Sequence, residues 1–314
     1  MTMKIHCRLR NRNILITVFI LNLILSLTGC ICPDTFTSRQ QFSIMLLPDT
    51  QFYSDKFPDV FYEQTEWVKN NIKRLNCKFV IHEGDIVDHN DVESEWLVAD
   101  KAMSKLDGVV PYCFAVGNHD IPTGLYNKFF PFSRYDSQPS YGGHYGNTND
   151  NSYHFFSAAG LDFMILCIQY DPNEQVLNWA NDIAAEHPNH RIIVAAHSYL
   201  DSDKFTAEGE KIFNSLVRKY ENIFLVICGH LSVGRRTDTG DNGNTIHSLL
   251  ANYQELDNGG QGWLRILTFL PDENLIKVRT YSTHLKKFFS EGDGKYSTPP
   301  INNFQISYDM SSKK

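Results

Sequence analysis

Short apolar runs alternate with helical periodicities over the first part of the chain. Residues 42–48, 79–82 and 111–116 are almost wholly apolar, which is typical of strands that are buried on both faces. Between these runs, apolar side chains recur every three or four residues over 60–75 and over 92–106, which predicts two helices. This β-α-β-α-β order predicts a parallel sheet with right-handed crossovers.

The later part of the chain begins with the same alternation and then changes. Strand patterns lie at 153–156, 162–168, 192–196 and 223–228, and helical patterns at about 176–188 and 207–219. From residue 244 onward the strand patterns have no helices between them, which predicts a second, more antiparallel sheet; they lie at 247–250, 264–270, 275–281 and 304–308. Residues 121–150 are rich in Tyr, Gly, Asn and Ser, and we predict a loop with a short helix near 127–132.

The N-terminus has the pattern of an export signal. Lys4, Arg8, Arg10 and Arg12 precede an almost wholly apolar stretch at 14–27. That stretch is short for a membrane span and fits the apolar region of a secretory signal peptide. An ordinary signal peptide or a short membrane anchor is the alternative to the lipoprotein signal described next.

The apolar stretch closes on Leu27-Thr28-Gly29-Cys30, which resembles a bacterial lipobox. The resemblance implies cleavage before Cys30 and a lipid on that cysteine, and Ile31 in place of Asp favours the outer membrane. We therefore predict a signal peptide at 1–29, a linker at 30–40 and a single domain at 41–314.

Charge and cysteine content narrow the classes of partner. The formal net charge is −7, and loss of the four basic residues of the signal would make it −11. An acidic protein gains nothing from counterion release, so a nucleic acid polymer is not expected as a partner. Of the seven cysteines, four lie in or beside strand patterns and are expected to be small buried hydrophobes; they are Cys77, Cys113, Cys167 and Cys228. No CxxC or Cys/His zinc spacing is present.

Potential metal ligands follow five of the predicted strands. They are Asp49, Asp85, Asn118, His197 and His230. Loops after the carboxyl ends of parallel strands are where α/β folds build their sites, and oxygen and imidazole ligands suit borderline-hard divalent cations. Two such cations about 3.5–4 Å apart can hold a hydroxide and neutralise a phosphate ester. His119, directly after Asn118, is placed to protonate a leaving oxygen, and Asp120 could orient it.

These segments together resemble the calcineurin-like metallophosphoesterase superfamily. The family pattern is DxH, GDxx(D/N), GNH(D/E), a later His, and GHxH. This chain has Asp49-Thr50-Gln51, Gly84-Asp85-Ile86-Val87-Asp88, Gly117-Asn118-His119-Asp120, His197, and Gly229-His230-Leu231-Ser232. The resemblance covers residues 44 to about 232 and implies an α/β fold: a four-layer αββα sandwich with two mixed β-sheets.

The resemblance also implies a role for each matching residue. Asp49 and Gln51 would bind a first metal, Asp85 would bridge, and Asn118, His197 and His230 would bind a second metal. His119 would act on the leaving group, with Asp88 and Asp120 supporting the site.

Two departures from the family pattern affect the first metal. Gln51 replaces the first His and Ser232 the last one. A neutral amide oxygen and a hydroxyl are weaker ligands than imidazole, so the first metal should bind loosely and prefer Mg²⁺, Mn²⁺ or Fe²⁺ to Zn²⁺. Two divalent ions are expected, drawn from Mn²⁺, Fe²⁺, Mg²⁺ and Zn²⁺.

Basic and polar residues after the last motif are candidates for substrate contact. Arg235 and Arg236 could clamp a phosphate bidentately, with a solvated pair as the alternative. Asn252 could line the pocket, although turn chemistry explains it equally well.

The sequence thus predicts a metal-dependent hydrolase of small phosphate mono- or diesters in the bacterial cell envelope. The nucleophile would be a hydroxide held by the metals and the general acid would be His119, with membrane contact through the lipid anchor. The alternative is a surface binding lipoprotein that keeps the fold and has lost catalysis. Retention of His119 and Asp120 favours the enzyme, because a binding protein needs no general acid.

Overall fold

The computed structural model describes residues 40–290, 293, 296 and 301–311. Arg39–Lys314 forms one compact unit. The predicted signal peptide, Cys30 and almost all of the predicted linker lie outside the described residues. Among the residues that are described, no helix is both long enough and apolar enough to cross a membrane.

The first sheet is built around the three strands predicted at the start of the chain. β1 (Phe42–Leu47), β2 (Cys77–His82) and β3 (Tyr112–Phe114) are parallel neighbours. Strands from the end of the chain extend this sheet on the other side of β1, all of them antiparallel. They are β13 (Trp263–Leu270), which pairs with β1, β14 (Leu275–Ser282), which pairs with β13, and β15 (Lys287–Phe288) and β16 (Asn303–Ser307), which both pair with β14.

The second sheet contains the central part of the chain in the order β11-β12-β10-β7-β6-β5-β4. Its parallel strands are β6 (Leu161–Ile168), β7 (Arg191–Ala196), β10 (Ile223–Cys228) and β12 (Thr245–Ala251). Antiparallel strands close both edges: β4 (Tyr141–His144) and β5 (Ser152–Ala158) on one side, β11 (Val233–Thr239) on the other. A separate short hairpin is formed by β8 (Leu200–Asp201) and β9 (Lys204–Phe205).

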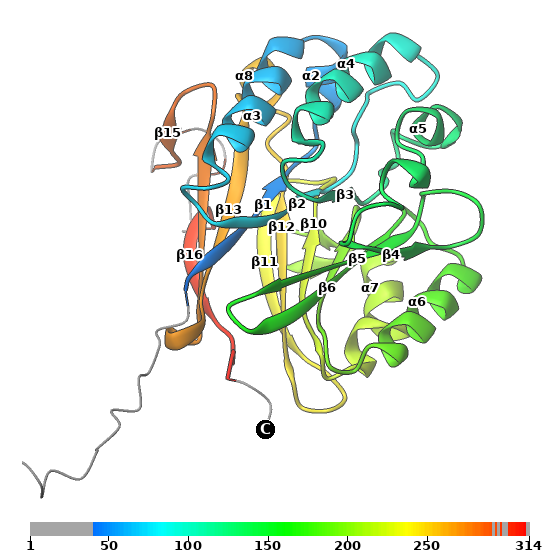
Figure 1. The fold of residues 1–314 in the computed structure, drawn as a ribbon, viewed down its shortest axis with the longest axis vertical. Helices are drawn as coiled ribbons and strands as arrows, with labels where there is room; N and C mark the ends of the chain where they lie inside the picture. Colours follow the sequence, from blue (N-terminus) through cyan, green and yellow to red (C-terminus); the bar gives the residue numbers. More distant parts are fainter. Residues whose placement is uncertain (1–39, 291–292, 294–295, 297–300, 312–314) are drawn as a thin grey trace, which may run out of the picture. The chain divides into compact units, whose positions relative to one another are not determined.

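The alternation of side chains along the strands produces the layers. Ile44 and Leu46 of β1 face the second sheet and pack with residues such as Ile165, whereas Met45 and Leu47 face the helices. On the outer side of the first sheet lie α2 (Gln51–Asp55), α3 (Pro58–Asn71), α4 (Glu93–Met103), α5 (Gly124–Phe129) and α8 (Asp257–Gly260). Against the second sheet lie α6 (Glu174–Glu186) and α7 (Ala207–Ser215). The order helix, sheet, sheet, helix in Figure 1 confirms the predicted αββα sandwich with two mixed sheets.

The predicted assignment of strands to sheets was wrong in one respect. β13, β14 and β16 do not form a sheet of their own but extend the sheet of β1–β3, while β12 joins β10 in the other sheet. Periodicity identifies a strand but not its neighbour, because pairing depends on contacts between residues that are distant in sequence. β4 and β11 were not predicted because they contain Gly and polar residues in place of an apolar run. The short helix expected at 127–132 begins and ends three residues earlier, at Gly124–Phe129.

Candidate metal centre

The polar residues that follow five strands converge where the carboxyl ends of the two sheets meet. Asp49, Asp85 and Asn118 come after β1, β2 and β3 of the first sheet, and His197 and His230 after β7 and β10 of the second. Since parallel strands present their carboxyl ends at one edge, each sheet brings its own residues together. The packing of the two sheets then brings the two sets into contact.

The tightest part of this site, which we call the second half-site, consists of Asn118, His197 and His230 beside Asp85. His197 Nε2 lies 3.2 Å from Asp85 Oδ2 and 3.1 Å from Asn118 Oδ1. The ligand atoms of Asp85, His197 and His230 all lie within 4.8 Å of one another. One cation could therefore contact all of them.

Backbone contacts orient the imidazole of His197. Its Nδ1 donates a hydrogen bond of 2.8 Å to the carbonyl oxygen of Glu83, which can only accept. This bond leaves Nε2 as the atom directed at Asp85 and Asn118. A histidine ligand whose second nitrogen is bonded to a carbonyl is a common arrangement in metal sites, because the bond fixes both tautomer and orientation.

We call Asp49 and Gln51 the first half-site. Asp49 is 3% exposed and its carboxylate accepts from the backbone N–H of His230 at 3.1 and 3.3 Å and from Asn252 Nδ2 at 2.9 Å. Gln51 begins α2, and its Nε2 donates to Asp88 Oδ1 at 3.1 Å. Hydrogen bonds thus hold both side chains in place.

Two observations show that these residues fit a bound cation. Gln51 Oε1 is buried and has no hydrogen-bond partner within the described residues, although buried amide oxygens are normally satisfied. A metal ion beside Asp49 and Asp85 would supply the missing partner. Gly229 also lies so close to the site that a Cβ there would stand 2.2 Å from Asp49 Oδ1, so only glycine leaves room for this carboxylate.

His119 lies at the rim of the site, with its side chain 36% exposed. Its Nδ1 donates to the carbonyl oxygen of Asp88 at 2.8 Å, and Asp88 Oδ1 lies 3.4 Å from the same nitrogen. The other nitrogen, Nε2, is therefore the one that can exchange a proton with a bound molecule. The backbone N–H of His119 bonds Asp85 Oδ1 at 2.9 Å, which ties this loop to the metal ligands.

Asp120 does not contact His119 in the way that was expected. Its buried carboxylate accepts backbone N–H groups of Gly117 and Ile86, both at 2.8 Å, and of Val87 at 3.3 Å. Asp120 therefore holds together the loops that carry Asp85 and Asn118, and Asp88 is the residue that orients His119.

Burial and the neighbouring charges shift several pKa values in the site. Burial alone would lower the pKa of His197, but the carboxylates of Asp85 and Asp49 raise it to about 10. Burial would raise the pKa of Asp85, yet His197 lowers it overall; burial raises the pKa of Asp49 well above its usual value. Burial and the charge of Asp85 raise the pKa of Asp120 to about 7. In the metal-free protein, His197 is therefore protonated, and its positive charge lies beside Asp85, where a cation would bind.

Within the described residues, no contact joins Arg235 or Arg236 to this centre, so the structure gives no support to the predicted phosphate clamp. Both lie on β11, which leads away from it. The guanidinium group of Arg236 bonds Asp238 at 2.7–2.9 Å, and that of Arg235 lies 4.6 Å from the ring centre of Phe304. The arginines were close to the last motif in sequence, but a strand carries its residues away at about 3.3 Å per residue.

Three further residues complete the site. Asn252, which the sequence left ambiguous, contacts both Asp49 and the carbonyl oxygen of His230, the latter at 2.8 Å. The ring of Tyr170, which follows β6, lies 5.8 Å from that of His230. Glu95 accepts the backbone N–H of Asp88 at 2.8 Å and so fixes its loop. Tyr170 could have been predicted from the sequence, because it follows a buried strand as the candidate ligands do. Glu95 does not follow a strand, so no comparable pattern marks it.

A four-layer sandwich with oxygen and imidazole ligands at the strand ends defines the class of metallophosphoesterases. The family model for "Calcineurin-like phosphoesterase" matches residues 42–234, and the chain belongs to that family. Members of the family use a dinuclear divalent metal centre, and the residues described above provide candidate ligands for one.

One curated relative matches most of this chain. The "Uncharacterized protein YvnB" of Bacillus subtilis (strain 168) is 36% identical over 263 residues, which cover 79% of this chain and 20% of that protein. This chain therefore spans about one fifth of the length of that relative.

Two solved structures share the fold at low sequence identity. Purple acid phosphatase PPD1 from yellow lupin has a TM-score of 0.53 at 14% identity, covering 87% of this chain and 55% of the other. A Plasmodium structure titled "GAP50 the anchor in the inner membrane complex" has a TM-score of 0.50 at 13% identity, covering 87% and 90%.

Proposed function

We propose that this protein is a metal-dependent hydrolase of small phosphate mono- or diesters that acts in the bacterial cell envelope. The observation that carries the proposal is the convergence of Asp85, Asn118, His197 and His230, which come from four separate strand ends. Membership of the calcineurin-like phosphoesterase family supports the reaction class.

The candidate ligands would serve two cations, with Asp85 available to both. Asn118, His197 and His230 would hold one ion, and Asp49 with Gln51 Oε1 would hold the other. Bound divalent ions at such a site acidify a water molecule and neutralise the charge of a phosphoryl group. Two carboxylates offset half of the four positive charges, so the site keeps a net attraction for an anionic ester.

His119 is the proposed general acid. When the bond between phosphorus and the leaving oxygen breaks, that oxygen takes the proton from His119 Nε2 and leaves as the alcohol. The bond from Nδ1 to the carbonyl oxygen of Asp88 keeps Nε2 directed at the bound ester during this step. Asp88 also accepts from Gln51, so the same side chain connects the general acid to the first half-site.

The first half-site should select a harder ion than the second. It offers only oxygen ligands, whereas the second half-site adds two imidazoles. We propose that Mn²⁺, Mg²⁺ or Fe²⁺ occupies the first half-site and is exchanged more readily than the ion in the second.

The test is hydrolysis of p-nitrophenyl phosphate and bis-p-nitrophenyl phosphate by the metal-depleted full chain, with Mn²⁺, Mg²⁺, Fe²⁺ or Zn²⁺ added singly. We expect turnover of at least one ester, and loss of that turnover in Asn118→Ala. Asn70→Ala, an exposed asparagine on α3, is the matched control and should behave as the unmodified protein.

If no ester is turned over with any of the four metals while metal still binds, the binding alternative is favoured over the hydrolase. A structural neighbour described as an anchor illustrates that this fold occurs in proteins described by other roles.

The envelope location has its own test. The chain should partition with membranes when expressed in a bacterium and carry a lipid on Cys30 at its cleaved N-terminus, whereas Cys30→Ser should stay uncleaved and lack the lipid, as measured by mass spectrometry.

A further inference from the structure

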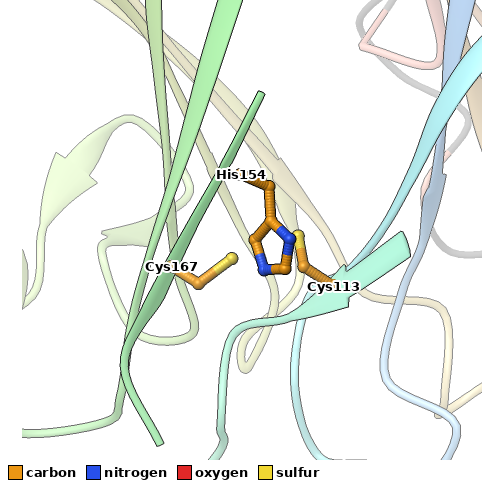
Figure 2. Close-up of side chains that lie close together, drawn as sticks. All are labelled: Cys113, His154 and Cys167. Carbon is orange, nitrogen blue, oxygen red and sulfur yellow. The ribbon is translucent and has the colours of Figure 1, made fainter. Parts of the chain in front are cut away.

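Three potential soft-metal ligands meet in the apolar layer between the two sheets (Figure 2). Cys113 lies on β3 of the first sheet, and His154 and Cys167 lie on β5 and β6 of the second. Each side chain is at most 2% exposed. The two sulfur atoms and one imidazole nitrogen all lie within 4.8 Å of one another, and Figure 2 shows both sulfur atoms turned toward the ring.

The strand register explains why these residues meet. Ser152 of β5 is directly opposite Cys167 of β6, so His154, two residues further along β5, is the diagonal neighbour of Cys167 on the same face. The facing sheet supplies Cys113. No sequence motif predicts this cluster, because its three residues become neighbours only through strand pairing and the packing of the two sheets.

The surroundings of the cluster are apolar and fix the imidazole. The ring centres of Phe79 and Tyr141 lie 5.7 and 5.4 Å from that of His154, both edge to face. Ser152 Oγ lies 3.1 Å from His154 Nε2 and so holds the orientation of the ring. Burial lowers the pKa of His154 to about 3, so the ring is neutral and keeps the lone pair that a metal ligand needs.

We propose that Cys113, His154 and Cys167 form a structural binding site for a thiophilic d¹⁰ cation, Zn²⁺ or Cu⁺, that links the two sheets. Thiolate and imidazole are the ligands these ions prefer. Sulfur atoms bonded to one ion at about 2.3 Å lie about 4 Å apart, which is within the 4.8 Å that bounds the separation of the ligand atoms here. Two thiolates and a neutral imidazole leave a Zn²⁺ complex with no net charge, which lowers the cost of placing an ion in this layer.

Binding must displace the proton of each thiol. Burial raises the pKa of the Cys113 thiol well above its usual value, so without metal it stays protonated. When the ion enters, both S–H bonds break, two metal–sulfur bonds form, and two protons pass to solvent. Three ligands suffice for Cu⁺, whereas Zn²⁺ would take a fourth. These two ions give different signals in the experiment below.

The site would lie just beneath the metal centre at the strand ends. Cys113 precedes Asn118 by five residues, and Cys167 precedes Tyr170 by three. An ion that joins β3 to β6 would therefore hold together the two strands that deliver those residues. Its proposed role is structural, and it does not depend on the proposed hydrolase function.

The experiment uses the full chain, purified under reducing conditions without metal. Titration with Co²⁺, a spectroscopic substitute for Zn²⁺, should give a near-ultraviolet thiolate-to-cobalt charge-transfer band, which oxygen and imidazole ligands do not produce. In parallel, Cu⁺ is titrated against a chromogenic chelator. The bound ion should raise the thermal unfolding midpoint and protect Cys113 and Cys167 from alkylation, as measured by mass spectrometry.

Controls separate this site from the strand-end centre and from unspecific thiol binding. Cys113→Ala and Cys167→Ala should abolish the band or the Cu⁺ binding, whereas Cys77→Ala, another buried cysteine, should keep it. Asn118→Ala should also keep it, even though hydrolysis is expected to fail in that variant. Protection of the unmodified chain from alkylation provides a result that does not require any variant to fold.

Three results would overturn the proposal. The first is neither a charge-transfer band nor Cu⁺ binding in the reduced chain. The second is a signal that persists in Cys113→Ala and Cys167→Ala. The third is a Cys113–Cys167 disulfide in protein purified without reductant, with no metal bound after its reduction.

Discussion

The two half-sites of the metal centre differ in how firmly the fold holds them and in what they offer a cation. The second half-site has two imidazoles and an amide oxygen, and its key ring is fixed by the Glu83 carbonyl. The first half-site has one carboxylate of its own and the amide oxygen of Gln51, which is left without a partner among the described residues. Both sets of side chains are held by hydrogen bonds, but only the first half-site keeps a buried oxygen that a cation would satisfy.

Because of this difference, the same fold could hold one ion tightly and exchange the other. Imidazole binds divalent transition metals more strongly than a neutral amide does, and its orientation here is set by the backbone. A loosely held ion beside a tightly held one would make activity depend on the supply of the first metal.

Loss of the general acid should be the most damaging change that leaves both half-sites intact. His119→Gln should lower kcat by about 10²–10⁴-fold, because the leaving oxygen would depart without a proton. Metal content, measured by mass spectrometry of the digested protein, should not change. An aryl ester with a good leaving group should be affected less than an alkyl ester; equal losses for both would contradict the role of His119.

Removal of one ligand from each half-site should separate them. Asn118→Ala should lower kcat/KM by about 10²–10³-fold at any metal concentration, a loss of the size seen when one key electrostatic contact is removed. Gln51→Ala should be largely rescued by excess Mn²⁺, because only a weak ligand is lost. Activity measured across a range of Mn²⁺ concentrations distinguishes the two, and equal rescue of both variants would remove the distinction between the half-sites.

Asn252 offers a test of the support around the first half-site. It donates to Asp49 and to the carbonyl oxygen of His230, so Asn252→Ala should weaken metal binding about 10–100-fold without removing a ligand. Isothermal titration with Mn²⁺ measures this change. Asn181→Ala, on α6 away from the site, is the control, and it should bind Mn²⁺ as the unmodified protein does.

The pH dependence should reveal the proton that the second half-site holds without metal. Because the pKa of His197 is raised to about 10, a cation must displace its proton, and metal affinity should rise about tenfold per pH unit between pH 7.5 and 9.5. In the same range the metal-free protein should lose stability. A group whose pKa is higher in the folded state stabilises the fold fully below its unfolded pKa and ceases to do so above its folded pKa.

Denaturant unfolding of the chelated protein at several pH values measures this loss, and His197→Gln is the reference. The difference in unfolding free energy between the two proteins should shrink as pH rises toward 10. A difference that is constant with pH would show that His197 is neutral in the metal-free fold.

Most of the buried strands, the α/β class and the candidate ligands could be predicted from the sequence. Uninterrupted apolar runs marked the buried strands, and the polar residue after each run marked its carboxyl end, because both signals are local in the chain. Asp85 and Asn118 were recognisable as ligands for this reason. Asp49, His197 and His230 followed from the same reasoning.

Tertiary structure alone decided what those local signals leave open. It placed β13 beside β1, moved Arg235 and Arg236 away from the site along β11, and gave Asp120 a role in holding loops. It also brought Cys113, His154 and Cys167 together from two facing sheets. Strand pairing and sheet packing join residues that are distant in sequence, and the energy that selects one pairing is spread over many side chains, so no short motif records it.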